Sequence, residues 1–470
     1  MLGLGSLSSL GVGTESVYGT PVAPTFYLPF KSENFQAPRE SVPSGALSGV
    51  RVVDNVALGI KALTGGFVLE NDANAVGQGI MYWNGISNGG YAYANTNTLS
   101  HFITAAPTAT TTGSDGTLTA GDYRYKVGSI LNRTVDNLKV IMPCSAEIAT
   151  PITVAGAVHV ALAFTNPTSL TLPFGFTYYG TAIYRTMAAG ATNTEKYLTT
   201  VVGTGASYND TGSVNNGATA ASAISPVTVS LHRHRFIAAP PTSGEDAVPS
   251  FTTLINKNNG LAEQYSGCRM NEFSLSAGGG NDPIEASFTA LGRNVVTVAE
   301  TTPSVGFMEP ILGWKAAGFV NNATSCELME SFQLQCTNNA AAVPGFCATP
   351  YNRDVASGIR GVSGSFNRTY EDHEFFDRVQ IGEEFALKFN CYGQPIVSTG
   401  AYIDLGGGVI AQPFPFFMEI ELFRCRSNQA GGNVGGPDRI VETVNFQAFK
   451  DATQGTEMRI TLYNTISQYV

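Results

Sequence analysis

Charge is scarce in this chain. Only 13% of its 470 residues are Asp, Glu, Lys or Arg, roughly half the share found in ordinary globular proteins. The net charge is −10, and the longest basic run is "HRHR" at 232–235. The clustered cations that bind a phosphate backbone tightly are therefore lacking. This composition excludes tight nucleic-acid binding and favours a protein that buries much of its surface against other protein.

Long apolar runs and a cysteine framework are lacking as well. No stretch approaches the roughly 18 apolar residues of a membrane-spanning helix, and the N-terminus lacks the features of a secretory signal peptide. The seven cysteines are widely spaced and form no CxxC pair, which argues against a zinc site or a disulfide framework. We expect buried free thiols. They are Cys144, Cys268, Cys326, Cys336, Cys347, Cys391 and Cys425.

Helical periodicity is rare, whereas alternating runs of β-branched and aromatic residues recur. Examples are "EFSLSA" from 272, "FFMEIELFRC" from 416 and "EMRITLYN" from 457, separated by turns rich in Gly, Asn and Asp. This pattern predicts a mainly β protein with antiparallel strands. Two helices are also predicted, in "NDANAVGQGIMYW" from 71 and "YEDHEFFDRVQ" from 370.

The two predicted helices indicate an internal repeat. Each follows a strand that contains glycine, "LTGGFVLE" ending at Glu70 and "GVSGSFNRTY" ending at Tyr370, and each half later contains a pair of strands. The second half therefore reads as a diverged copy of the first. Residues 105–225 interrupt the first copy with Thr/Gly/Ala-rich edges and regularly spaced strands, which is typical of a small inserted β-sandwich.

Five motifs outside the inserted segment stand out in order along the chain. They are "GVGTESVYGTPVAPTFYLPFKSENF" (11–35), "YSGCRMNEFSLSAGGGNDPIEASFTALGR" (265–293), "ESFQLQCTNNAAAVPG" (330–345), "GIRGVSGSFNRTYEDHEFF" (358–376) and "ATQGTEMRITLYNTISQY" (452–469). In this order and spacing they resemble the tail tube proteins of long-tailed bacteriophages. The inserted segment contains "LTAGDYRYKV", "AIYRT" and "ASYNDTG", through which it resembles an immunoglobulin-like domain of the fibronectin type III kind.

The resemblance implies a structural virion protein and not an enzyme. In that family, β-sandwich or barrel domains with a flanking helix join their inner sheets into rings, and the rings stack into the tube through which DNA is ejected. The implied partners are other copies of the chain and the tape measure, terminator and baseplate proteins. DNA would pass through the lumen without specific binding, and neither a membrane, a cofactor nor a metal is implied. The implied location is the phage tail, after assembly in the host cytoplasm.

The resemblance and the repeat together predict two tandem tail tube domains plus an inserted immunoglobulin-like β-sandwich, which should lie outside the channel. Two tube domains per chain predict homotrimeric rings with pseudo-sixfold character; if the duplication is illusory, the rings are hexamers. The expected segments are an extended arm (1–35), a discontinuous first tube domain (36–104 and 226–300), the insert (105–225) and a second tube domain (301–470).

Two sets of residues are candidates for assembly and for the channel. The proline-containing arm costs little entropy to order on a neighbour, so it is expected to brace adjacent subunits or rings. Carboxylates opposite the core face of the strands are expected to line a channel that repels DNA, although they also fit the plain polar face of an antiparallel sheet. The arm candidates are Thr14, Glu15, Tyr18, Pro21, Pro24, Phe26 and Tyr27, and the channel candidates are Glu272, Glu285, Glu419 and Glu421.

Rival hypotheses remain open at this point. One is another virion ring protein, either a tail terminator or a baseplate component, and the other is a secreted carbohydrate-binding β-protein. Three tempting sites have plainer interpretations. His232 and His234 have no third metal ligand nearby, the glycine-rich "AGGGND" loop (277–282) joins two strands and opens no helix, and the acidic cluster at 371–377 fits the first turn of a helix.

Overall fold

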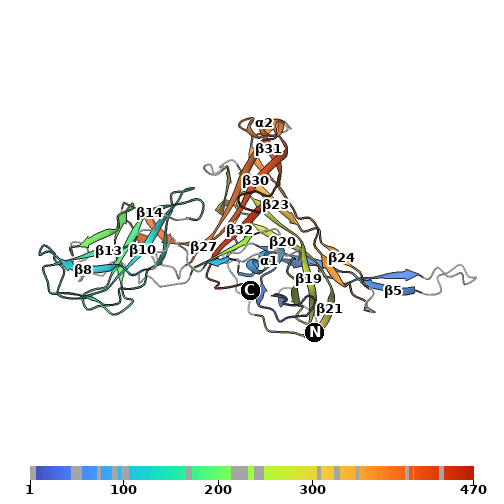
Figure 1. The fold of residues 1–470 in the computed structure, drawn as a ribbon, viewed down its shortest axis with the longest axis horizontal. Helices are drawn as coiled ribbons and strands as arrows, with labels where there is room; N and C mark the ends of the chain where they lie inside the picture. Colours follow the sequence, from blue (N-terminus) through green and yellow to red (C-terminus); the bar gives the residue numbers. More distant parts are fainter. Residues whose placement is uncertain are drawn as a thin grey trace, which may run out of the picture.

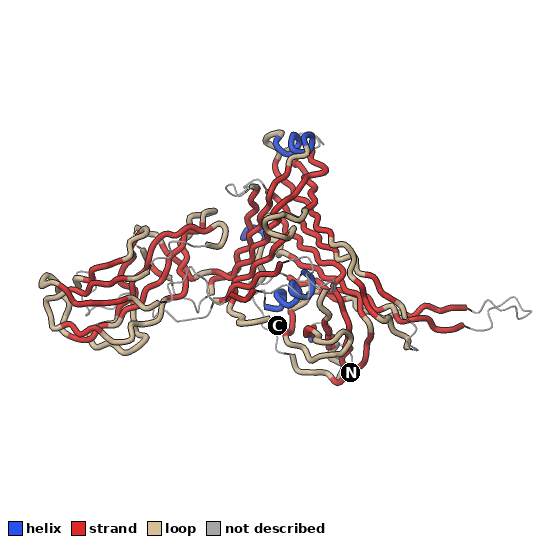
Figure 2. The backbone as a smooth tube through the Cα atoms, in the orientation of Figure 1, coloured by secondary structure: helices blue, strands red, loops and turns tan. Residues whose placement is uncertain are grey.

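The computed structural model consists of a central β body, a lateral lobe and a tower (Figure 1). The tower contains parts of β30 (Pro415–Gly432) and β31 (Val441–Ala448) and ends at helix α2 (Glu374–Ile381). Strands dominate, and the described residues contain two α-helices, α1 (Val76–Ile86) and α2 (Glu374–Ile381), with a 3₁₀ turn η2 (Gly313–Lys315) (Figure 2). The prediction of a mainly β fold is confirmed. The structure describes residues 7–43, 56–70, 76–86, 94–96, 105–165, 172–212, 231–237, 248–303, 309–321, 329–345, 349–396, 402–405, 407–432 and 439–469.

The long strand β19 (Leu261–Gly278) belongs to two sheets. Its first half pairs with β18 (Phe251–Asn256) and β21 (Asn294–Ala299). Its second half pairs with β20 (Glu285–Gly292) and β23 (Met329–Thr337). The strand therefore carries the chain from one layer of the body into the other.

The long strand β30 (Pro415–Gly432) behaves in the same way. Its first half pairs with β27 (Glu384–Pro395) and β32 (Met458–Asn464), and its last residues pair with β31 (Val441–Ala448). Both long strands have 18 residues. Each is followed by a hairpin partner, β20 or β31, and then by a strand that returns to its first half, β21 or β32.

A continuous antiparallel sheet, called here the inner sheet, runs β3 (Ser32–Glu33), β6 (Leu63–Glu70), β20, β19, β23, β26 (Gly361–Thr369), β31 and β30. Alternate side chains along these strands point to opposite faces. One face is buried and aromatic, and the other carries hydroxyl and amide side chains. The buried aromatic side chains are Phe67, Phe273, Phe288, Phe332, Phe366 and Phe446.

The remaining strands of the body form the second layer and cover the aromatic face. One row runs β7 (Ala94–Thr96), β17 (His232–Ile237), β32, β30, β27 and β22 (Ala316–Val320). Another runs β2 (Phe26–Leu28), β1 (Ser9–Thr14), β18, β19 and β21. Short pairs join β24 (Ala341–Val343) to β25 (Asp354–Ala356), and β4 (Arg39–Pro43) to β5 (Val56–Lys61).

Helix α1 closes the core between the two layers. Tyr82 is fully buried, with the rings of Phe236, Phe273 and Phe288 centred within 6.1 Å of its own. Gly79 is required because a Cβ there would lie 2.1 Å from the ring of Tyr469. Glycine lowers the stability of an isolated helix, but at this position it allows the ring of Tyr469 to pack closely against α1.

The lateral lobe, residues 105–212, is a β-sandwich with its own apolar core. Its larger sheet runs β15–β14–β10–β11 and continues into β29 and β28; a smaller sheet runs β16–β13–β8, and β9 pairs with β12. The strands are β8 (Thr108–Thr112), β9 (Gly121–Tyr123), β10 (Tyr125–Arg133), β11 (Lys139–Cys144), β12 (Ile152–Val154), β13 (His159–Ala163), β14 (Phe176–Arg185), β15 (Lys196–Val202), β16 (Ser207–Asp210), β28 (Ile403–Asp404) and β29 (Ile410–Pro413).

The lobe is joined to the body by more than its two chain connections. Strand β29 lies parallel to β11, so a segment far along the chain extends the larger sheet of the lobe. Phe176 of the lobe packs against Tyr392, Phe414 and Phe417, with ring centroids 5.5–6.0 Å apart. This shared apolar cluster fixes the lobe against the second layer of the body.

Candidate assembly surfaces

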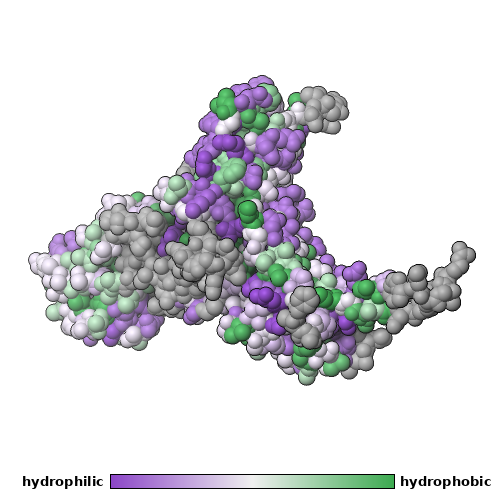
Figure 3. Space-filling model, turned by 45° about the vertical axis from the view of Figure 1, so that its right-hand side comes forward, coloured by the Kyte–Doolittle hydropathy of each residue, from purple (hydrophilic) through white to green (hydrophobic). Residues whose placement is uncertain are grey.

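The polar face of the inner sheet carries mostly hydroxyl and amide side chains. It lines a shallow groove of about 710 Å³, and Glu272 is the one charged residue among those that line the groove. Figure 3 shows hydrophilic residues over much of the visible face of the tower. Polar residues that line the groove are Ser274, Ser276, Gln333, Gln335, Ser363, Ser365, Asn428, Gln429 and Asn445.

The four carboxylates expected in a channel wall fall into two groups. Glu272 lies in the groove, and Glu285 lies on the same face of β20, where its carboxylate binds the Lys31 ammonium at 2.5 Å. This hydrogen bond raises the pKa of Lys31. The Lys31 charge offsets that of Glu285, but Glu70 lies opposite Glu285 on the same face. Lys31 therefore stands beside two carboxylates, and Glu272 adds another charge in the groove.

Glu419 and Glu421 lie elsewhere, in the half of β30 that belongs to the second layer. They are only 6% and 4% exposed. Glu421 binds the Lys388 ammonium at 3.1 Å and the Arg459 guanidinium. Burial, reinforced by the charge of Glu421, raises the pKa of Glu419 to about 7. Buried and outside the inner sheet, these two residues are no longer candidates for a channel wall.

The N-terminal segment packs against its own chain over residues 9–28 and is not a free arm there. β1 pairs along its whole length with β18 and also with β2. Leu10 and Val12 are fully buried. Gly11 is required because a Cβ there would lie 2.7 Å from the ring of Pro24. These residues therefore form part of the folded subunit.

The residues expected to brace neighbours mostly have partners within the chain. The buried carboxylate of Glu15 accepts hydrogen bonds from the Thr252 hydroxyl and from the Gly267 and Gly19 amides. Tyr18 lies against the guanidinium of Arg269, and burial raises the pKa of its hydroxyl. The other contacts are Thr14 to Asn84, Phe26 to the Tyr469 ring and Tyr27 to Thr301, whereas Pro21 is exposed.

Two edges of the inner sheet have no partner strand among the described residues. In β30, Ser427–Gly432 pair with β31 on one side only. At the opposite end, β3 pairs with β6 only. The Asn34 and Gln36 amides donate to β6, so by alternation the Phe35 and Ala37 amides point away from the sheet. The Glu33 side chain accepts the hydrogen bond from Phe35.

The two halves of the inner sheet match in register, which the sequence patterns showed only as a general likeness. The "CRMN" of 268–271 and the "CRSN" of 425–428 each contain a β-bulge at the asparagine. Gly65 lies opposite Ala290, and Gly364 lies opposite Phe446. Aligning the two repeated tetrapeptides would have shown this correspondence before the structure was known.

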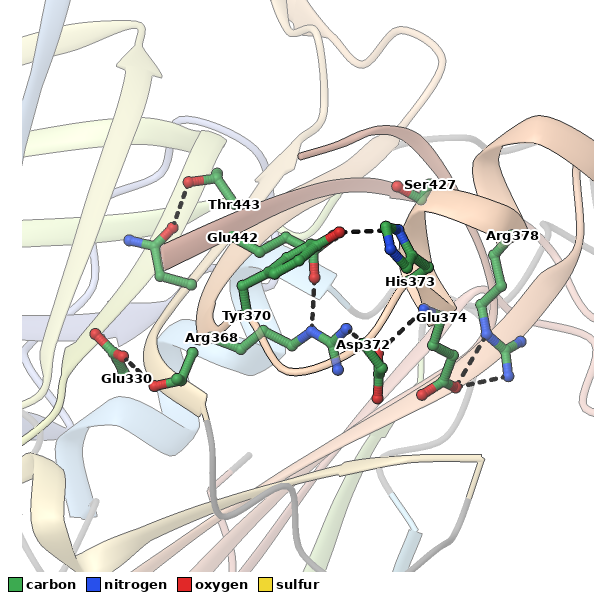
Figure 4. A network of polar contacts seen from close by, with 12 residues as sticks. Glu330, Arg368, Tyr370, Asp372, His373, Glu374, Arg378, Ser427, Glu442 and Thr443 are labelled. Carbon is green, nitrogen blue, oxygen red and sulfur yellow. Dashed lines mark hydrogen bonds and ion pairs between the residues drawn. The ribbon is translucent and has the colours of Figure 1, made fainter. Parts of the chain in front are cut away.

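The acidic cluster near α2 is a structural network (Figure 4). Arg368 binds the buried carboxylate of Glu442 at 2.7 Å and the exposed carboxylate of Asp372 at 2.6 Å. Asp372 also accepts the Glu374 amide at the start of the helix, and these hydrogen bonds, with that of Arg368 first, lower its pKa. The network anchors α2 to the end of the inner sheet. Glu374 and Asp377 lie in the first turn of the helix, as the helix-turn interpretation predicted.

The other tempting sites also have structural explanations. The Nε2 of His234 donates to Asn464 Oδ1 at 3.0 Å and to the Ile466 carbonyl at 2.8 Å. Among the described residues, no group of three His, Cys, Asp or Glu side chains is arranged to hold a metal. The loop that contains Gly280 connects β19 to β20 as a hairpin. The five described cysteines are buried and free, and Cys326 and Cys347 lie outside the described residues.

A last surface is the β4–β5 hairpin, which projects from the body (Figure 1). All five residues of β4 are exposed. Val42, Val56, Leu58 and Ile60 are apolar side chains that are 41–61% exposed. An exposed apolar ribbon of this kind marks a contact surface.

Comparison with known proteins identifies the family. No helix in the described ranges combines the length and the apolar character needed to cross a membrane. No curated protein sequence matches the chain. A family model described as phage tail tube protein matches residues 5–448. The chain therefore belongs to the phage tail tube protein family and is a structural protein of the virion tail, as its motifs indicated.

Proposed function

We propose that copies of this chain join the free edges of their inner sheets into a closed ring, and that stacked rings form the channel for DNA ejection. The observation that carries this proposal is that one chain leaves two edges of the same sheet unpaired, Ser427–Gly432 and β3. Closure between chains would remove edges that otherwise invite uncontrolled pairing.

The junction inside the chain supplies a template for the junction between chains. We propose that the chain contains two tandem tube units, the first giving β3, β6, β20 and β19 to the inner sheet and the second giving β23, β26, β31 and β30. Strand β23 of the second unit pairs with β19 of the first. By the same relation, β3 of the next copy would pair with β30.

The template also gives a register. With the bulges aligned, Gly431 corresponds to Ser274, because each lies three residues after the bulge asparagine of its strand. Gln36 corresponds to Gln335, because the two lie opposite the equivalent residues Thr64 and Ser363. Ser274 pairs with Gln335 within the chain. Gly431 of one copy would therefore pair with Gln36 of the next, and Gln429–Gly432 with Phe35–Pro38.

This arrangement implies rings of three chains with pseudo-sixfold symmetry. The polar face of the inner sheet would line the lumen, and the wall would be chiefly hydroxyl and amide, with Glu272 in the groove and with Glu70 and Glu285 beside Lys31. Lys31 and Arg426 beside this face are paired with Glu285 and Glu384, so they offer DNA no free cationic attachment point. This revises the expectation of an acidic cylinder, since the groove holds one carboxylate per chain.

The remaining parts find places in the same assembly. The lateral lobe, an immunoglobulin-like insert, would lie outside the tube because it packs on the second layer and not on the polar face. The β4–β5 hairpin, with its exposed apolar side chains, would contact a neighbouring copy or ring. The tape measure, terminator and baseplate proteins are the proposed partners at the two ends of the polymer.

Engineered cysteines test the register directly. Gly431 has open space around its Cβ position, and opposed residues in a sheet lie at separations that a disulfide can bridge. The Gly431→Cys/Gln36→Cys chain should give covalently closed trimers when polymerised and oxidised. Ser274→Cys/Gln335→Cys is the positive control, because that pair should close within one chain. Gln36→Cys alone should not cross-link.

Electron microscopy of the polymer then separates the alternatives. Hollow polymers whose discs contain three chains support the proposal, and discs of six chains support the hexamer. Isolated rings that never stack would favour a tail terminator. Polymers that form without the Gly431–Gln36 cross-link would contradict the proposed register but not the tube itself.

A further inference from the structure

The lateral lobe contains a buried amine, a carboxamide and a carboxyl group in one cluster. Lys126 on β10 and Glu195, just before β15, have side chains that are 1% and 0% exposed, with Lys126 Nζ 3.4 Å from Glu195 Oε2. The same Nζ donates to Oδ1 of Asn193 at 2.6 Å. Burying an ion pair in a sandwich core carries a large desolvation cost, which an ordinary stabilising role does not explain well.

Two further observations point to chemistry at this cluster. Neither carboxyl oxygen of Glu195 has a donor partner within the described chain. The carboxylate of its neighbour Glu147 is bound by the Arg124 guanidinium at 2.7 Å and by the backbone N–H of Asn193 at 2.8 Å. Burial, followed by a hydrogen bond with Glu147, raises the pKa of Glu195 to about 7. Glu195 can therefore hold or release a proton beside the amine.

The geometry brings the amine within reach of the carboxamide carbon. A carbonyl bond is about 1.23 Å long, so the Asn193 Cγ lies no farther than about 3.8 Å from Lys126 Nζ, given the contact at 2.6 Å. Reacting atoms in productive complexes stand about 3–3.5 Å apart. Asn193 sits in an exposed turn with φ 61°, so a small leaving group has a path to solvent.

We propose that Lys126 and Asn193 form an intramolecular isopeptide bond, with Glu195 as the acid–base residue. The Lys126 ammonium gives a proton to the Glu195 carboxylate, and the neutral Nζ attacks Cγ of Asn193. The new C–N bond forms and the Cγ–Nδ2 bond breaks. The attacking nitrogen gives one of its two hydrogens to the departing NH2 group, Glu195 returns the proton it took, and the nitrogen leaves as ammonium. An amine and a carboxamide become a secondary amide, so no oxidant or reductant is needed.

The bond would tie β10 to the turn before β15 across the larger sheet of the lobe. A covalent link between distant positions limits the unfolded ensemble, and an external domain of a tail would gain resistance to unfolding. The inference depends only on the lobe and does not rely on how the tube assembles.

Mass spectrometry of the full chain tests the proposal. The folded wild-type protein should weigh less than its sequence by one ammonia, and a digest should contain a branched peptide joining the segments of Lys126 and Asn193. The branched peptide is the decisive readout, since Asn–Gly sites such as Asn84–Gly85 can also lose ammonia. Glu195→Gln and Asn193→Gly should lack it; glycine is chosen because it tolerates the positive φ.

The lobe offers a matched internal control. Lys139 Nζ donates to Asn132 Oδ1 at the same 2.6 Å, and none of the lobe's described ion pairs places a buried carboxylate on this lysine. No branched peptide should join these two. Only linear peptides from Lys126 and Asn193 in a folded chain would overturn the proposal. An undiminished link in Glu195→Gln, or an equal link at Lys139, would do the same.

Discussion

Asn271 and Asn428 occupy the same bulge in the two long strands, but only Asn271 is engaged by a neighbouring segment. The Asn271 carbonyl accepts the Asn338 amide at 2.7 Å, and its side-chain Oδ1 accepts the Ala340 amide at 2.9 Å. Asn428 is exposed, and no hydrogen bond of this kind reaches it from the described residues. One bulge therefore lies at a junction between strands of the chain, and under the proposed ring closure the other would receive the equivalent contact from a neighbouring copy.

The first prediction compares these two asparagines. Asn271→Ala should destabilise the subunit by about 1–3 kcal/mol, because it leaves the Ala340 amide without its acceptor. Asn428→Ala should change the free energy of unfolding by less than about 0.5 kcal/mol yet weaken polymerisation. Thermal unfolding of the subunit and sedimentation of the polymer measure the two effects. Equal destabilisation by both variants would count against the assignment of Asn428 to an interface.

A second prediction concerns the opposite edge of the inner sheet. Ala37→Pro removes an amide that points away from β6, so the subunit should remain folded while ring closure fails. Gln36→Pro is the matched control, because the Gln36 amide donates to the Thr64 carbonyl at 2.9 Å inside the subunit. A proline there should destabilise the fold itself. Normal tubes from Ala37→Pro would show that β3 is not a joining edge.

The third prediction concerns the proposed lumen. Gln333→Lys/Gln335→Lys would place two cations per chain on the polar face, near the centre of the groove. DNA release from assembled particles should become slower and regain speed as salt is added, because phosphate contacts weaken with ionic strength. Gln333→Glu/Gln335→Glu controls for the change of size. Unaltered release from the lysine particles would place this face outside the channel.

Sequence patterns predicted the fold class and the polarity of individual strands but not the layer in which each strand lies. The alternation around Phe273 and Leu275 correctly placed Glu272 on a polar face. The same alternation around Ile420 predicted that Glu421 would also lie on the channel face. That half of β30 instead lies in the second layer, where Glu421 binds Lys388. The alternation of apolar and polar residues shows which side chains share a face of a strand. Only the pairing of strands far apart in the sequence decides what covers each face.

Two other features could not be predicted for the same reason. The N-terminal glycines and prolines indicated an extended segment, and the segment is extended, but its pairing with β18 is a contact across more than 200 positions of sequence. The addition of β29 to the lobe likewise joins Lys139 to Ala411. Local composition does not indicate such pairings. The domain boundaries inferred from it therefore divide the chain by sequence position and miss strands that join a sheet from a distant part of the chain.

The fourth prediction is a pH dependence that His234 imposes on stability. Burial lowers its pKa from 6.5 to about 4, against the opposing effect of its hydrogen bonds to Ile466 and Asn464. Between these values the unfolded chain binds a proton that the folded chain does not, so stability is lost as the pH falls from about 6.5 towards 4. The full effect is at most about 3 kcal/mol.

The measurement is the difference between wild type and His234→Gln, since a glutamine can still donate to the same two acceptors. Glu419, with its raised pKa, contributes with the opposite sign, as its stabilisation is lost when the pH rises through about 7. Subtracting the variant cancels that contribution. The unfolding free energy of wild type should therefore fall more steeply below pH 6.5 than that of His234→Gln. Parallel curves for wild type and His234→Gln would mean that the histidine has the same pKa in the folded and unfolded chain, contrary to the prediction.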